Sequence, residues 1–177
     1  MEIQTGRPLI ENDRLEKEIM VYDLLDQLNI WYQRVDHEPL ATMEACQEVD
    51  QLLGVNMCKN LFLCNTQKTA FYLLLMPGDK KFKTKDLSSQ IGSARLSFGS
   101  YEHLEKFLDI TPGSVSLMGL MNDKGKQVQL LIDEDIVKEE YLACHPCINT
   151  SSIKIKMKDI LDKFLPYVEH QPIIVKL

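Results

Sequence analysis

The chain has 177 residues, of which 45% are hydrophobic and 26% charged, and it carries a formal net charge of −6 at pH 7. This composition is ordinary for one globular domain, and no apolar run reaches the roughly 18 residues that a membrane span requires. The negative charge argues against broad, non-specific nucleic-acid binding, but not against an enzyme that grips only the end of an RNA.

The N-terminal quarter predicts a lead-in, two helices and a strand. Residues 1–10 are expected to be a loose lead-in, with the folded domain over residues 11–177. Thr42 is placed to cap a helix that ends near Gly54, because threonine favours the N-cap and glycine the C-terminal stop. A short strand is expected over 30–35. An amphipathic helix over 13–28 is predicted from apolar residues at helical spacing, which are Leu15, Ile19, Tyr22, Leu25 and Leu28.

Apolar runs between turn residues predict the remaining elements. Strands are expected at 61–64, 70–76, 95–98, 128–132, 142–144, 152–156 and 173–175, and helices at 84–90, 100–108 and 158–165. The strand at 152–156 alternates isoleucine with lysine and is expected to be half exposed. Because strands and helices interleave throughout, the pattern predicts an α/β fold with a mixed sheet in a single domain.

The five cysteines cannot form a complete disulfide framework, because their number is odd. The N-terminus also lacks the basic start and apolar core of a signal peptide, so a reducing, cytoplasmic location is expected. Cys144 and Cys147 have the Cys-x-x-Cys spacing of redox sites, but a strand follows them and no helix is available to activate a thiolate. The other cysteines are scattered, so neither a metal nor a cofactor is expected.

Lys59 and Asn60 directly precede a buried apolar run. A lysine at the mouth of a strand can direct its ammonium group at a phosphate or a ribose oxygen, although a solvated lysine and a turn asparagine explain the same residues. His37 can act as a general base near neutral pH, or can simply bond to the backbone of a turn. Thr42 can face a pocket as well as cap its helix.

Two loops of small residues, 91–100 and 112–123, flank one short helix. Glycine and serine there allow backbone N–H groups to approach a ligand closely. The chain has no Walker loop, dinucleotide fingerprint or nucleophile elbow, and it offers no strong nucleophile. Covalent catalysis is therefore not indicated.

Five short motifs occur in a family order over roughly residues 24–177. They are His37-Glu38-Pro39 with Thr42 and Ala45, Lys59-Asn60-Leu61-Phe62-Leu63, Gly92 with Arg95-Leu96-Ser97-Phe98 and Glu102, Pro112-Gly113-Ser114-Val115-Ser116 with Gly119-Leu120 and Asn122-Asp123, and His145-Pro146 with Asn149-Thr150. Together they resemble the freestanding prolyl-tRNA editing domains, a family of aminoacyl-tRNA deacylases related to YbaK and to the insertion domain of prolyl-tRNA synthetase.

The resemblance implies an α/β single domain around a mixed, strongly curved sheet flanked by helices. It implies that Lys59 is the key functional residue, that Asn60 supports it, and that His145 lines the same site. The backbone N–H groups of Gly113 and Ser114 are expected to stabilise the tetrahedral oxygen. Substrate-binding roles are expected for His37, Thr42, Phe62, Arg95, Ser97, Val115, Ser116 and Leu117.

The alanine-type members of the family are most similar, which implies hydrolysis of alanine wrongly attached to proline tRNA. Two departures from the family pattern are Glu38, which stands between histidine and proline, and Leu117, which replaces the usual loop proline. Leu117 keeps open the same reaction on cysteinyl- or seryl-tRNA. A non-catalytic module that binds aminoacyl-tRNA or an amino acid is a second alternative, and a thiol-redox protein a third.

The expected partner is the acceptor end of a mischarged proline tRNA, with prolyl-tRNA synthetase as a transient partner. No membrane association is expected, and the protein should be a monomer or a weak homodimer. The lysines of segment 80–85 are a hypothetical RNA-facing patch, because four of these residues carry positive charge.

Overall fold

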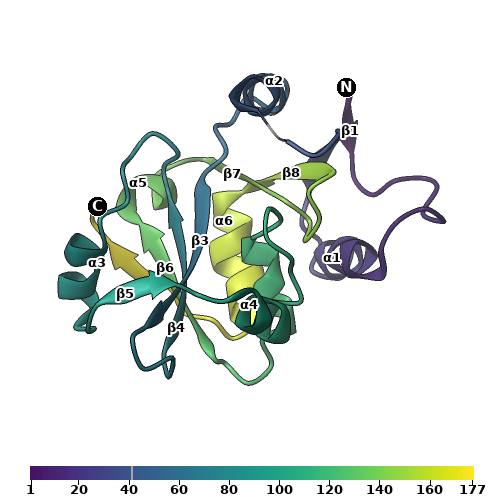
Figure 1. Ribbon diagram of the computed structural model, residues 1–177. Coiled ribbons are helices and arrows are strands. Elements are labelled where there is room, and N and C mark those ends of the chain that lie inside the picture. The colour runs from purple at the N-terminus through teal and green to yellow at the C-terminus, as the bar shows by residue number, and fades with distance from the viewer. Residues whose placement is uncertain (41) are drawn as a thin grey trace.

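Two β-sheets, rather than one, organise the chain (Figure 1). The computed structural model describes residues 1–40 and 42–177. The first sheet is antiparallel, in the order β1 (Ile3–Thr5), β2 (Tyr32–Asp36), β8 (Ser151–Lys156) and β7 (Tyr141–Cys144). The second has the order β5 (Leu96–Phe98), β3 (Lys59–Asn65), β4 (Phe71–Met76), β6 (Val128–Asp133) and β9 (Ile173–Val175).

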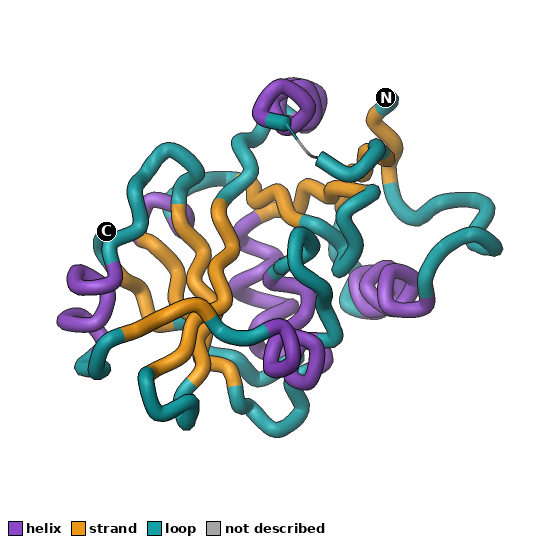
Figure 2. The backbone as a smooth tube through the Cα atoms, in the orientation of Figure 1, coloured by secondary structure: helices purple, strands orange, loops and turns teal. Residues whose placement is uncertain are grey.

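The second sheet is mixed. β3 runs antiparallel to both β4 and β5, whereas β6 is parallel to β4 and β9 is parallel to β6. These strands lie side by side at the centre of the molecule, with helices on both sides (Figure 2). The predicted α/β fold is confirmed, and so is the mixed character of a sheet. The single sheet is corrected to two, because β8 pairs with β2 and β7, whereas β3 pairs with β4 and β5.

Five helices lie close to their predicted positions, and two short ones at 117–122 and 134–137 are additional. The helices are α1 (Glu16–Gln27), α2 (Met43–Leu53), α3 (Thr84–Ile91), α4 (Tyr101–Leu108), the 3-10 helix η1 (Leu117–Asn122), α5 (Glu134–Val137) and a continuous helix formed by α6 (Met157–Asp159), the π-helical η2 (Ile160–Phe164) and α7 (Leu165–Tyr167). Thr42 Oγ1 accepts a hydrogen bond from the Ala45 N–H at 3.1 Å, and Gly54 ends α2 with φ +66°. Asp109, with φ +53°, ends α4 before the predicted Pro112-Gly113 stop.

Three hydrophobic clusters divide the interior. The main core lies between the two sheets and includes residues of α1, α4, η1 and α6. A second cluster lies on the other face of the second sheet, where α3 contributes Leu87. The third joins Val49 and Leu53 of α2 to Val35 and Ala143 of the first sheet. None of the described helices is long and apolar enough to cross a bilayer.

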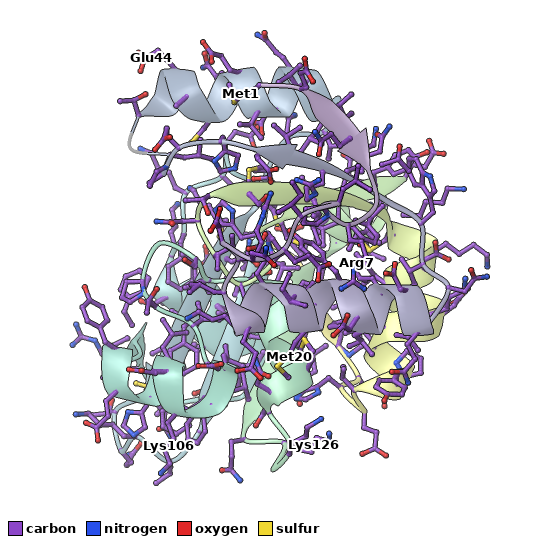
Figure 3. The ribbon with its side chains drawn as sticks, turned by 90° about the vertical axis from the view of Figure 1, so that its right-hand side faces the viewer. Met1, Arg7, Met20, Glu44, Lys106 and Lys126 are labelled. Carbon is purple, nitrogen blue, oxygen red and sulfur yellow. The ribbon has the colours of Figure 1, made fainter. Side chains whose placement is uncertain are left out.

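One expectation differs from the structure. Part of the expected loose lead-in is strand β1, which pairs with β2 because that strand would otherwise present an open edge. The chain then turns back along α1, where Arg7 forms ion pairs with Asp23 and Asp26 (Figure 3). The alternation expected at 152–156 is confirmed in β8, where Ile153 and Ile155 are buried, Lys154 is partly exposed and Lys156 is exposed.

Candidate functional site

His145 follows directly after β7, and its ring has one nitrogen bound and one free. Nδ1 lies 2.8 Å from the Ser151 carbonyl oxygen, which can only accept, so Nδ1–H donates. Among the residues that the structure describes, none forms a hydrogen bond with Nε2. The hydroxyl of Ser116 donates to the His145 carbonyl at 2.6 Å and fixes the backbone at this point. A neutral His145 therefore presents the Nε2 lone pair in a defined orientation.

Burial lowers the pKa of His145 below its ordinary value of 6.5. The hydrogen bond to the Ser151 carbonyl raises the pKa in part, whereas nearby His37 lowers it further. The imidazole is therefore neutral at pH 7. A neutral, oriented imidazole with a free nitrogen is suited to accept a proton from water.

His37 lies beside His145, with ring centroids 6.1 Å apart. Its Nδ1–H donates to the Glu38 carbonyl at 2.8 Å, and its Nε2 is 2.8 Å from the Ser152 hydroxyl. The His37 N–H also donates to the carbonyl of Thr150 at 3.0 Å. These bonds hold the end of β2 against the beginning of β8, so the two predicted histidines do come together.

Asn60 contains an unsatisfied acceptor. Its Nδ2 donates to the Cys58 carbonyl at 3.2 Å and contacts the Cys58 sulfur at 3.5 Å, whereas its buried Oδ1 has no hydrogen-bond partner among the described residues. Buried polar atoms without partners are rare in folded proteins and call for a physical reason. An N–H or O–H group of a substrate would satisfy this oxygen.

Lys59 and Asn60 leave β3 on opposite faces of the second sheet, because successive side chains of a strand alternate. Asn60 shares its face with Phe62, in the main core, whereas Lys59 shares its face with Leu61, beside the second cluster. The Lys59 ammonium donates to the Lys80 carbonyl at 2.5 Å. Neighbouring positions in the sequence therefore give these two side chains different surroundings.

The loop at 111–116 differs from its predicted role in one respect. The N–H of Ser114 already donates to the Thr111 carbonyl at 3.1 Å, so it is not free to bind an oxyanion. Gly113 has φ +88°, a conformation that other residues rarely adopt, and a Cβ there would lie 3.9 Å from Asn149 Nδ2. Ser114 and Asn149 line a cavity of about 460 Å³ beside the start of α1.

The other predicted substrate-binding residues lie in different places. Phe62 and Leu117 are buried in the main core, Val115 packs against it, and Thr42 is an exposed cap. Arg95 and Ser97 are exposed. Ser97 pairs in register with Cys64, four residues and about 13 Å along β3 from Asn60. The structure thus brings His37, His145 and Ser116 together, whereas Arg95 and Ser97 lie on the surface, away from Asn60.

Three residues that the sequence analysis did not single out for this site take part in it. Ser152 contacts His37, Cys58 holds Asn60, and the Lys80 carbonyl holds Lys59. No local pattern marks Ser152 or Lys80, because each meets its partner through a strand pairing or turn distant in sequence. Cys58 was visible only as an isolated cysteine.

The thiols of Cys144 and Cys147 are free and fully buried. Burial raises both pKa values, to about 12 for Cys147. Both thiols are therefore protonated at neutral pH, which does not suit a redox nucleophile. Over residues 1–40 and 42–177, no group of three or more His, Cys, Asp or Glu residues is arranged to hold a metal ion.

Comparisons with known proteins agree on one family. The family model described as an aminoacyl-tRNA editing domain matches residues 37–163, which include Lys59, Asn60 and His145. The "Prolyl-tRNA editing protein ProX" of Acetoanaerobium sticklandii is 34% identical over 136 residues, covering 77% of this chain and 83% of ProX. The "Prolyl-tRNA synthetase associated domain-containing protein 1" of Xenopus laevis is 27% identical over 165 residues, covering 91% and 96% of the two chains.

A solved structure described as a candidate trans-editing enzyme for prolyl tRNA synthetase has a TM-score of 0.66 at 15% identity, and the match covers 92% of this chain and 98% of that one. The crystal structure of the protein APE2540 has a TM-score of 0.65 at 13% identity, with coverage of 89% and 98%. At these identities the two structures show a shared fold.

Proposed function

We propose, because the chain belongs to the aminoacyl-tRNA editing domain family, that it is a trans-acting deacylase that proofreads for prolyl-tRNA synthetase. The observation that carries this proposal is His145, which has a free Nε2 and whose ring lies beside that of His37 within the matched region. The name of ProX, a prolyl-tRNA editing protein, supports proline tRNA as the carrier.

The amino acid removed is proposed to be alanine. A synthetase site for proline cannot strongly reject a smaller side chain, because a methylene or two gives only about 1–3 kcal/mol of discrimination. A second site that admits alanine and excludes proline by size would complete the selection. Leu117 does not weaken this proposal, because its side chain is packed in the core.

In the proposed reaction a water attacks the carbonyl carbon of the aminoacyl ester. His145 Nε2 accepts a proton from that water as the new C–O bond forms. The ester C–O bond then breaks as the protonated imidazole returns this proton to the ribose oxygen. The Gly113 N–H is the proposed oxyanion donor, and losing one such donor typically costs about 3–4 kcal/mol. Ser114 supports the turn rather than the oxyanion, since its N–H is already bound.

Asn60 and Lys59 position the substrate in this scheme. The unpartnered Oδ1 of Asn60 accepts a hydrogen bond from the ribose hydroxyl or the α-amino group. The Lys59 ammonium uses one donor on the Lys80 carbonyl and directs another to the terminal phosphate or ribose. The aminoacyl ester is already activated, so positioning and a base are sufficient without a covalent intermediate.

The test is single-turnover hydrolysis of Ala-tRNA(Pro), Pro-tRNA(Pro), Cys-tRNA(Pro) and Ser-tRNA(Pro) by the wild type. Selective loss of alanine is expected. Selective loss of cysteine or serine would keep the reaction and change the substrate. Absence of hydrolysis with all four would favour a non-catalytic module that binds aminoacyl-tRNA. A cytoplasmic location, a transient contact with the synthetase and a monomeric or weakly dimeric state remain parts of the proposal.

A further inference from the structure

Lys80 lies in the turn after β4, and its backbone oxygen is the observed partner of Lys59. The register of β3 and β4 places Lys59 opposite Met76, so the chain that leaves β4 turns back over the beginning of β3. There the Lys80 carbonyl oxygen accepts a hydrogen bond from the Lys59 ammonium at 2.5 Å. The orientation of Lys59 therefore depends on where this turn is held.

The side chain of Lys80 anchors the turn to the end of β6. Its ammonium lies 3.0 and 3.2 Å from the two carboxylate oxygens of Asp133, 2.7 Å from Asp135 and 2.9 Å from the Leu177 carbonyl. Asp133 is fully buried, and its Oδ1 also accepts the Asp135 N–H. The hydrogen bonds that the ammonium donates to Asp135 and Asp133 raise the pKa of Lys80, so it stays charged.

The turn is also close to the segment that enters β3. The Lys80 N–H donates to the Pro77 carbonyl at 3.3 Å, and a Cβ on Gly78 would lie only 3.2 Å from the Met57 carbonyl. A displacement of the turn would therefore move the Lys80 carbonyl relative to the beginning of β3. By contrast, Lys81, Lys83 and Lys85 are exposed and form no ion pair within the described part of the chain.

We propose that Lys80 is a positioning residue for the editing reaction: its side chain locks the turn onto Asp133 and Asp135, so that its backbone carbonyl fixes the Lys59 ammonium. This inference rests on the proposed function of Lys59. It also removes Lys80 from the hypothetical RNA-facing patch, because its charge is already paired with Asp133 and Asp135. The first sheet contributes nothing to this arrangement, so it is independent of His145.

The test compares Lys80→Met, Lys80→Arg and Lys158→Met by single-turnover hydrolysis of the mischarged tRNA. Lys158 forms an exposed ion pair with Asp162 at 2.7 Å. Lys158→Met is therefore the control for Lys80→Met, because it also removes one lysine from an ion pair. Lys80→Met should lower the rate constant about 10- to 100-fold, as expected for a displaced positioning group. Lys80→Arg should restore most of the rate, and Lys158→Met should leave it unchanged.

A double variant separates positioning from a general loss of structure. In the Lys59→Ala background, Lys80→Met should cause no further decrease, because the group it positions is already gone. The same fold-decrease in both backgrounds would overturn the proposal, as would a normal rate for Lys80→Met. If Lys59→Ala itself retained normal activity, the proposed function of Lys59 would fail instead.

A spectroscopic measurement keeps the test independent of residual activity. In protein labelled with 15N-lysine, the hydrogen-bonded Lys59 ammonium should give a resolved signal, assigned by its absence from Lys59→Ala. The signal should disappear in Lys80→Met and remain in Lys80→Arg and Lys158→Met. An unchanged Lys59 signal in a folded Lys80→Met would show that the turn does not depend on this side chain.

Discussion

The imidazole rings of His37 and His145 lie with their centroids 6.1 Å apart, although they belong to opposite ends of the matched region. Both rings donate through Nδ1–H to carbonyl oxygens, which leaves Nε2 of His37 for Ser152 and Nε2 of His145 free. In the proposed reaction, His37 acts through the position and the electrostatics of its neighbour His145.

The rate of deacylation should depend on the neutral form of His145. Its pKa is lowered by burial, so the rate should rise with pH through a midpoint below 6.5 and then stay constant through pH 7.5. His145→Ala should lower the plateau by about 10²- to 10⁴-fold and abolish this dependence. The measurement is the single-turnover rate constant between pH 5 and 8. If the rate of His145→Ala still rose with pH through the same midpoint, another group would be responsible for the titration.

Lys59→Ala should lower Ala-tRNA(Pro) hydrolysis at least about a hundredfold, comparable to the loss of one catalytic electrostatic contact. Its midpoint of thermal unfolding should remain close to that of the wild type, because Lys59 is only half-buried at the beginning of β3. Lys158→Met serves as the control. Near-normal hydrolysis by Lys59→Ala would reject its assigned role.

Asn60→Ala should separate stability from activity. The substitution removes a buried oxygen that has no hydrogen-bond partner. The midpoint temperature of unfolding should therefore stay within a few degrees of the wild-type value. Deacylation should nevertheless fall about tenfold or more, because the substrate loses one hydrogen bond. Thermal unfolding and single-turnover rates measure the two effects, and a parallel loss of both would indicate a structural role.

Cys144→Ser with Cys147→Ser should retain deacylase activity. Burial raises both thiol pKa values, so neither thiolate is available at neutral pH. The native wild type should likewise resist alkylation by iodoacetamide at pH 7 until it is unfolded. Loss of hydrolysis in a double variant that folds normally would restore a catalytic role for these thiols.

Asp36→Asn should destabilise the protein at pH 7 by roughly 1–2 kcal/mol, because it removes a carboxylate partner of the buried Arg34, while solvent screens the Asp36 side chain, which is 38% exposed. Burial opposes ionisation of Asp36, but hydrogen bonds from Arg14, Arg34 and Ser151 hold its pKa well below its usual range. Its contribution is therefore present above about pH 4 and is lost as the pH falls towards the folded-state pKa.

Unfolding by urea between pH 3 and 7 tests this dependence. The difference in the free energy of unfolding between the wild type and Asp36→Asn should become smaller at low pH. Asp162→Asn, in an exposed ion pair, should change the free energy of unfolding by no more than about 1 kcal/mol. If this difference in free energy did not change with pH, the charge of Asp36 could not be its cause.

The sequence by itself determined most element positions. Thr42 and Gly54 bound α2 as expected, because caps act within a turn of the helix they end. The apolar runs likewise located β3, β4 and β6 to within two residues. It also predicted His37 and His145 as site residues, through the motifs that resemble the family.

Only the tertiary structure decided how these elements share a site. Strand pairing divides the chain into two sheets and places Ser152 against His37, and these contacts join residues far apart in sequence. Strand alternation sends Lys59 and Asn60 to opposite faces, and only the returning turn at Lys80 shows what holds the lysine. Local propensity fixes where a strand or helix begins, but the direction and environment of a side chain depend on non-local packing.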